Sequence, residues 1–114
     1  MGPWNTEEID LARKTPFIAI LNHLGAYHKR DNDYSPVEPK RGSIRVQVGY
    51  EAKDYRFIFT GEKWVNELLP EGHTNRGGGG AIDFVQHLLK CGFVQAVKIC
   101  LDTQIALNGA KHGK

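Results

Sequence analysis

Two neighbouring stretches of alternating side chains constrain the fold of this chain most. The apolar residues at every second position of 43–50 and 55–60 are Ile44, Val46, Val48, Tyr50, Tyr55, Phe57 and Phe59. Period-two alternation of β-branched and aromatic residues predicts strands. A loop over residues 51–54 would pair Val48 with Phe57 and Val46 with Phe59. The large apolar side chains then share one face of a hairpin, and the opposite face carries Arg45, Gln47 and Arg56.

The hairpin is expected to continue into a third strand and to be flanked by helices. Gly61 and Glu62 suit a two-residue turn, after which residues 63–66 would return with Trp64 opposite Phe59. Residues 26–42 are interpreted as a loop with a short strand near Tyr27. Apolar spacing predicts helices over about 6–14, 17–24, 81–90 and 93–101, the first capped by Thr6. We therefore expect one α+β domain over 1–114, with its core at about 6–101, a three-stranded antiparallel sheet and a flexible tail over 102–114.

The composition is that of an ordinary globular protein. Of the 114 residues, 40% are hydrophobic and 25% are charged, and the formal net charge is +2. That charge permits a nucleic-acid partner only through a local basic patch. Two cysteines make no secreted disulfide framework. No apolar run approaches the ~18 residues of a membrane span, and the N-terminus has no signal-peptide pattern, so a cytoplasmic protein is expected.

The glycine run at 77–80 directly precedes a predicted helix, which is where phosphate-binding loops occur. A P-loop requires Lys followed by Ser or Thr after its last glycine, but Ala81 and Ile82 follow here. The dinucleotide fingerprint requires a βαβ unit, which the pattern does not contain. We therefore interpret the run as a flexible turn that lets the backbone pass close to a neighbour.

Metal and catalytic sites are not expected. The candidate donors are His23, His28, His73, His87, Cys91 and Cys100. His87 and Cys91, four residues apart, would share a helix face, but no Cys-x-x-Cys or Cys-x-x-His pair occurs, and structural zinc requires four donors in tight local pairs. No Ser, His or carboxylate lies in an activated-nucleophile context. We expect no bound metal, no cofactor and no enzymatic activity.

Basic and aromatic residues between positions 27 and 64 favour the binding of single-stranded nucleic acid. Proteins that bind single strands combine cationic tracks with aromatic side chains on which bases stack. Acidic residues such as Asp31, Asp33, Glu51 and Asp54 occupy the same region, so a solvated surface of mixed charge is the alternative.

Three short strings then occur in a characteristic order. Ser-Ile-Arg-Val at 43–46 follows a Pro-Lys-Arg-Gly segment, Gly-Gly-Ala-Ile-Asp-Phe lies at 79–84, and Phe-Val-Gln-Ala-Val lies at 93–97. Over about residues 6–101 this order resembles the zinc-binding domain of bacterial DNA primases. The resemblance implies a zinc-ribbon-like sheet whose face, with nearby basic residues, contacts a single-stranded template. The family's four zinc-ligand positions are occupied here by Ser35, Glu38, Gly72 and Asn75, which implies a metal-free relative of the kind found in plasmid and mobile-element primase-like proteins.

The expected function is a single-stranded DNA-binding accessory module in the replication or transfer of a plasmid or mobile element. The expected nucleic-acid-binding residues are Arg30, Tyr34, Lys40, Arg41, Arg45, Arg56, Lys63 and Arg76. The alternative is a protein–protein interaction domain that docks on a primase, helicase or relaxase, and a weaker option is a regulator that binds duplex DNA. Neither a membrane nor a small-molecule substrate is an expected partner.

Overall fold

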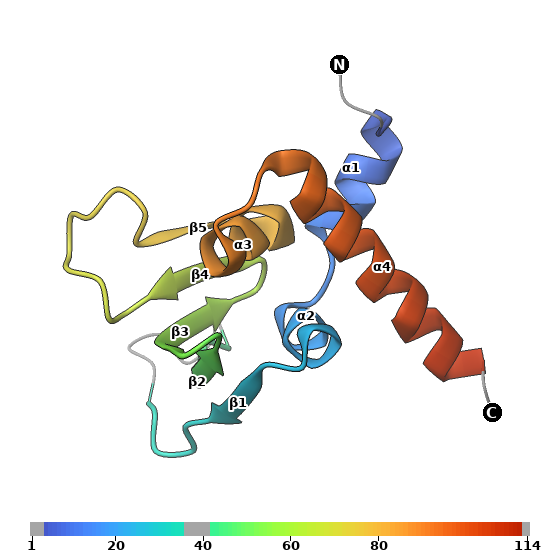
Figure 1. Ribbon diagram of the computed structural model, residues 1–114. Helices are drawn as coiled ribbons and strands as arrows, with labels where there is room; N and C mark the ends of the chain where they lie inside the picture. Colours follow the sequence, from blue (N-terminus) through green and yellow to red (C-terminus); the bar gives the residue numbers. More distant parts are fainter. Residues whose placement is uncertain (1–3, 36–41, 113–114) are drawn as a thin grey trace. The chain divides into compact units, whose positions relative to one another are not determined.

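The computed structural model describes residues 4–35 and 42–112, with side chains described as far as residue 108 (Figure 1). The fold is α+β, as predicted, with a five-stranded antiparallel sheet in the order β1-β2-β3-β4-β5 and the helices α1 to α4. The chain divides into two compact units, and each is described here by itself. The helical unit comprises Met1–Gly25 and Gly80–Lys114, and the sheet unit comprises Ala26–Gly79.

The first two helices of the helical unit begin and end at clear local signals. Helix α1 spans Thr6–Arg13 and is capped by Asn5, whose side chain accepts from the backbone N–H of Glu8 while the Glu8 carboxylate accepts from that of Asn5. The expected cap at Thr6 is therefore wrong by one residue, because Asn5 completes a reciprocal capping box. Helix α2 spans Phe17–Leu24 and ends at Gly25, whose φ of 71° is left-handed.

Helix α4 is longer than its sequence predicts. Helix α3 spans Gly80–Leu89, and α4 spans Phe93–His112 and packs against α1, α2 and α3. The expected helix end near Leu101 is wrong, because the helix continues to His112. The extension is held by tertiary contacts: Thr103 is only 1% exposed, and Gln104 Nε2 donates to the Leu11 carbonyl at 2.8 Å and to Thr15 Oγ1 at 3.1 Å.

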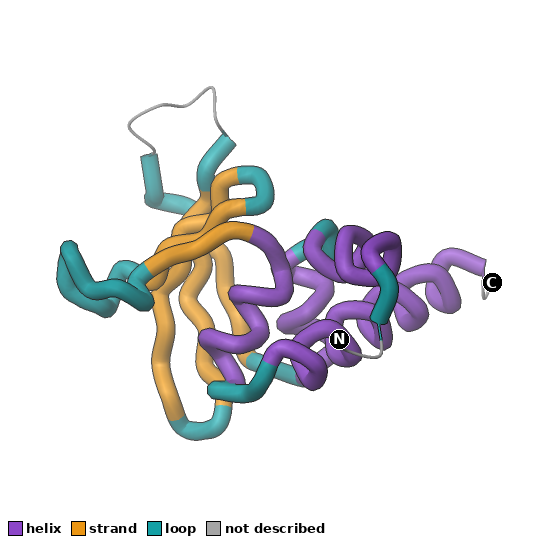
Figure 2. Tube along the Cα trace, turned by 90° about the horizontal axis from the view of Figure 1, so that it is seen from above, coloured by secondary structure: helices purple, strands orange, loops and turns teal. Residues whose placement is uncertain are grey.

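The sheet has five strands where a three-stranded sheet was predicted, and its first strand confirms the short strand expected near Tyr27. Strands β2 (Ile44–Tyr50), β3 (Lys53–Thr60) and β4 (Lys63–Asn66) confirm the predicted central meander, and β1 (Tyr27–Arg30) and β5 (Gly77–Gly79) form the two edges (Figure 2). The glycine run is thus mostly a strand, not a flexible turn. Its close approach to a neighbour is confirmed, because a Cβ on Gly77 would lie 2.8 Å from the Trp64 carbonyl oxygen.

The register differs from the predicted one by two residues. Val46 pairs with Phe57 and Val48 with Tyr55, because the β2–β3 turn contains only Glu51 and Ala52, with φ of 52° and 65°. Positive φ at both central positions is the mark of the type I′ hairpin turn. A shift of two residues preserves the faces, so the predicted division into an apolar and a polar face is correct. The predicted Phe59–Trp64 pair is confirmed.

Each unit has its own apolar cluster. On one face of the sheet the rings of Tyr55, Phe57 and Phe59 stack with centroids 5.5 and 5.6 Å apart, and Trp64 meets Phe57 edge-on at 6.0 Å. In the helical unit the rings of Phe17 and Phe84 lie 4.9 Å apart. Among the described residues no single helix is long and apolar enough to cross a membrane, and α3 with α4 meets those criteria only as a pair bent by 113°.

Candidate functional site

The polar face of the sheet collects basic side chains from four adjacent strands. Lys29 on β1 lies opposite Gln47 on β2, which lies opposite Arg56 on β3. Arg45 lies two residues before Gln47, and Lys63 on β4 lies opposite Thr60. Since directly paired residues point to the same side of a sheet, these four cations and Gln47 share the face opposite Phe57. We call this surface, with Tyr27, the polar face.

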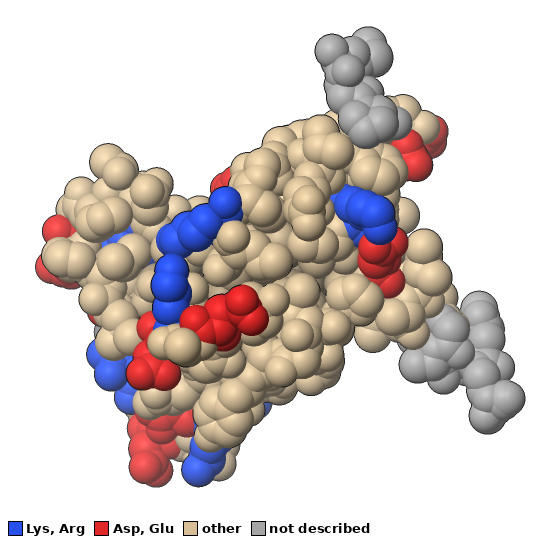
Figure 3. All heavy atoms as spheres, viewed as in Figure 1, with Lys and Arg blue, Asp and Glu red and all other residues tan. Residues whose placement is uncertain are grey.

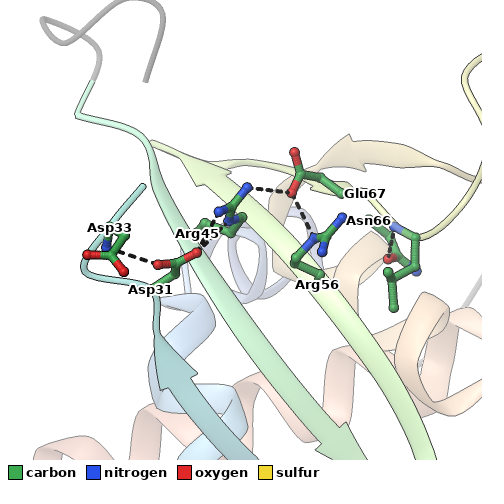
Figure 4. Close-up of polar contacts among 7 residues, drawn as sticks. Asp31, Asp33, Arg45, Arg56, Asn66 and Glu67 are labelled. Carbon is green, nitrogen blue, oxygen red and sulfur yellow. Dashed lines mark hydrogen bonds and ion pairs between the residues drawn. The ribbon is translucent and has the colours of Figure 1, made fainter. Parts of the chain in front are cut away.

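Two carboxylates contact the central arginines: Asp31 lies beside Arg45, and Glu67 lies between Arg45 and Arg56 (Figure 4). Arg45 donates to Asp31 Oδ2 through Nε at 2.9 Å and through Nη2 at 2.6 Å. Glu67 Oε1 lies 3.1 Å from Arg56 Nε and 3.6 Å from Arg45 Nη1. Asp31, Arg45, Glu67 and Arg56 thus form a continuous charge network of zero net charge.

The backbone places both carboxylates by the same device. Asp31 directly follows β1, and its N–H donates to the Arg45 carbonyl at 2.8 Å. Glu67 directly follows β4, and its N–H donates to the Arg56 carbonyl at 2.7 Å. Each carboxylate is therefore held beside its arginine by one further backbone hydrogen bond between the strands, just beyond the end of β1 or β4.

The network shifts the proton affinities of its members. The hydrogen bond from Arg45, followed by one from the Asp33 backbone N–H, holds the pKa of the Asp31 carboxyl below its usual range. The same bond raises the pKa of Arg45. Both side chains are therefore charged throughout the physiological range. Arg45 is further fixed by the Tyr34 ring, whose centroid lies 5.0 Å from the Arg45 Cζ atom.

The structure brings some of the predicted binding residues together and separates others. Arg45, Arg56 and Lys63 lie on the polar face, and Tyr34 joins them through Arg45. Arg30 does not, because it pairs with Val46 and so belongs to the opposite side of β1. Arg76 lies just before β5, where its Nε donates to the Leu69 carbonyl at 2.9 Å. Lys40 and Arg41 lie outside the described residues.

Tyr27 and Lys29 belong to the basic and aromatic residues noted between positions 27 and 64, but they were not among the expected binding residues. The pairing of Asp31 and Glu67 with the arginines was not predicted. The short strand near Tyr27 was the one available signal. Its register with β2, which the sequence does not specify, decides that Lys29 rather than Arg30 joins the polar face. Where Figure 3 shows the sheet unit, Lys and Arg side chains lie next to Asp and Glu side chains. The visible surface is thus of mixed charge and is not an uninterrupted basic patch.

The candidate metal donors do not form a site in the part of the chain that is described. No group of three or more His, Cys, Asp or Glu residues is suited to hold a metal ion there. The expected common helix face of His87 and Cys91 is wrong, because α3 ends at Leu89 and Lys90 has a φ of 56°. Burial raises the pKa of the Cys100 thiol to about 12, so it is protonated at neutral pH. The absence of zinc stays a prediction.

Comparison of the chain with protein-family models, with curated proteins and with solved structures finds no match. The arrangement of the polar face therefore has to be interpreted from its own chemistry.

Proposed function

We propose that the polar face of the sheet binds single-stranded nucleic acid. The observation that carries the proposal is the register that places Lys29, Arg45, Arg56 and Lys63 on one face across four neighbouring strands. Adjacent strands lie about 4.8 Å apart, so cations on successive strands can follow a phosphate backbone that crosses the sheet. Single-strand binding surfaces use such a track together with aromatic side chains, and Tyr27 and Tyr34 lie beside it.

The four cations would play different parts. Arg45 and Arg56 are each bound to a carboxylate, so a phosphate would meet them as members of a neutral, ordered network. Lys29 and Lys63 are exposed, with no ion pair to a described residue. These two lysines supply most of the net attraction in this proposal, since exposed point charges release counterions when a phosphate binds.

The resemblance to the primase zinc-binding domain supports the same proposal. In that family the sheet face and nearby basic residues contact a single-stranded template, and here the polar face carries the cations. The proposal therefore extends to a non-enzymatic, cytoplasmic accessory protein in the replication or transfer of a plasmid or mobile element. We also propose that the meander of β2, β3 and β4 is a metal-free counterpart of the zinc-ribbon-like sheet of that family.

A pair of matched charge variants tests the proposal. Changing Lys29 and Lys63 together to Gln should weaken the binding of a fluorescent single-stranded oligonucleotide. It should also lower the slope of log affinity against log salt by about 1.4, since each phosphate contact to a single strand contributes about 0.7. The control changes Lys14 and Lys90, exposed residues of the helical unit, to Gln and should leave the slope unchanged. Equal loss in the two variants would show that net charge, not the polar face, determines binding.

The alternative, a protein-docking domain, is favoured by one observation in the helical unit. Helix α4 exposes large apolar side chains, with Ile105 69% and Val94 47% accessible. A shallow hollow of about 250 Å³ lies between α2 and α4 and is lined by Ala19, Asn22, His23, Thr103, Ala106 and Leu107. Docking of a primase, helicase or relaxase there would persist at high salt, because apolar contacts are not screened. Ile105→Asp should abolish such docking and leave oligonucleotide binding unchanged.

A further inference from the structure

A hollow of about 510 Å³ lies beside the edge strand β1, at one border of the polar face. Tyr27, Lys29 and Gln47 line it from the sheet, and residues 30–33 line it from the end of β1 and the turn that follows. Its volume lies within the range of pockets that hold small molecules and single nucleotides. Its lining is predominantly polar, which does not suit an apolar side chain.

Tyr27 is the aromatic side chain at this hollow, and it is 63% exposed. Its cross-strand partner is Gly49, and the Tyr27 Cδ2 atom lies 3.7 Å from where a Cβ of Gly49 would be. The Tyr27 ring therefore lies beside Gly49 of β2, which has no side chain that could cover the ring. Tyr34 is less suited to receive a base, because the Arg45 guanidinium already lies over its ring.

The charges around the hollow favour a ligand that is both aromatic and anionic. Lys29 and Arg30 are exposed cations at its rim. Arg30 belongs to the opposite side of β1 from Lys29, but it is the last residue of this edge strand and still lines the hollow. Asp31 also lines it, but its negative charge is compensated by Arg45 at 2.6 Å. Two cations therefore face one carboxylate, Asp33, that has no ion pair with a described residue. The Gln47 amide, which can both donate and accept, lies on the same wall as the ring and Lys29 and can reach the polar edge of a planar ring.

We propose that this hollow is a nucleotide subsite in which one unstacked base of a bound single strand stacks on Tyr27 while its phosphate lies against Lys29 and Arg30. The proposal rests on the proposed function and adds to it a specific position at the edge of the sheet where a base is held. Stacking on an aromatic ring is tolerant of sequence, because every base has a π-face. The subsite therefore provides affinity through the base as well as through the backbone.

The test combines a protein variant with a modified strand. The probes are a fluorescein-labelled 20-nucleotide thymidine oligomer and an abasic oligomer of the same length, titrated by fluorescence anisotropy at low salt. Wild-type protein should bind the abasic strand about tenfold more weakly than the thymidine strand. Tyr27→Ala should bind the thymidine strand about tenfold more weakly and should no longer distinguish the two strands, whereas Tyr27→Phe should behave as wild type. Phe93→Ala, which removes an exposed aromatic ring from the helical unit, is the control.

The outcomes separate the subsite from the proposed function. If wild-type protein binds both strands equally, or if Tyr27→Ala retains the wild-type discrimination with the circular dichroism spectrum unchanged, the subsite is wrong while single-strand binding stands. If wild-type protein binds neither strand, both proposals are wrong. Binding of free thymidine monophosphate as tight as that of the oligomer would overturn the assignment of the hollow to a strand and assign it to a free nucleotide.

Discussion

At the scale of single residues, Phe57 has no exposed surface, and its ring contacts those of Tyr55, Phe59 and Trp64. Truncation to alanine would leave a cavity at the centre of this aromatic row. We expect Phe57→Ala to lower the free energy of unfolding by about 3–5 kcal/mol, measured by urea denaturation. Ile58→Ala, at the next position of β3 and on the polar face, should cost clearly less. Similar losses for both variants would show that the two faces of the sheet are buried alike.

Asp31 provides a prediction about pH at the same scale. A carboxyl whose pKa is lower in the folded chain stabilises the fold above its unfolded pKa of about 3.9, and this contribution is lost as the pH falls through the lowered value. Wild type should therefore be more stable than Asp31→Asn between pH 5 and 7, and the difference should shrink below about pH 4. The measurement is the urea midpoint of both proteins across that range.

The partner of Asp31 supplies the control for this prediction. In an Arg45→Met background, Asp31→Asn should cost much less stability than in wild type, because Arg45 makes the dominant hydrogen bond to the Asp31 carboxylate and the smaller contribution of the Asp33 backbone N–H remains. A cost of Asp31→Asn that stays constant down to pH 2, or that is as large without Arg45 as with it, would contradict the origin assigned to the lowered pKa.

Period-two alternation predicts at residue scale which side chains share a face, but it does not predict their polar partners. It places Arg45 and Arg56 correctly on the polar face, because side chains alternate between faces and a register shift of two residues leaves each side chain on its original face. It does not predict their neutralisation by Asp31 and Glu67. These carboxylates lie 14 and 11 residues along the chain from the arginines whose hydrogen bonds they accept, and only the strand ends bring them close.

At the scale of elements, the β2–β3 turn requires a backbone conformation that its two residues disfavour. Glu51 and Ala52 both adopt positive φ, which costs a non-glycine residue about 1 kcal/mol or more. Replacing the pair by Asn-Gly, the preferred type I′ sequence, should raise the free energy of unfolding by about 1 kcal/mol, as measured by urea denaturation. Gly61→Ala, at a φ of 60° in the next turn, should lower it by a similar amount. A destabilised Asn-Gly variant would show that the turn is not of this type.

The elements that the sequence did not predict share one physical cause. Strand β5 consists of glycines, which are depleted in strands, and it forms because Gly77 alone allows the approach to the Trp64 carbonyl. The second half of α4 has weak apolar periodicity, and its helical structure depends on the burial of Thr103 and on the hydrogen bonds of Gln104 to the distant residues Leu11 and Thr15. In both cases tertiary contacts decide the local structure, and these contacts cannot be seen in a window of neighbouring residues.

At the scale of the whole molecule, two surfaces lie on separate compact units and imply different partners. The sheet unit, Ala26–Gly79, presents the polar face, whereas the helical unit exposes apolar residues of α4. Nucleic-acid binding by the first should depend steeply on salt, and protein docking by the second should not. The two functions can therefore be separated by where a ligand acts as well as by how tightly it binds.

The most direct measurement of the central claim is a titration of ¹⁵N-labelled protein with an unlabelled 20-nucleotide single strand, followed by amide chemical shifts. We predict that the largest changes occur at β1, β2, β3 and β4, centred on Lys29, Arg45, Arg56 and Lys63, that they fade as salt is added, and that a duplex of the same length causes smaller changes. Changes confined to α4, or no changes at low salt, would contradict the assignment of single-strand binding to the polar face.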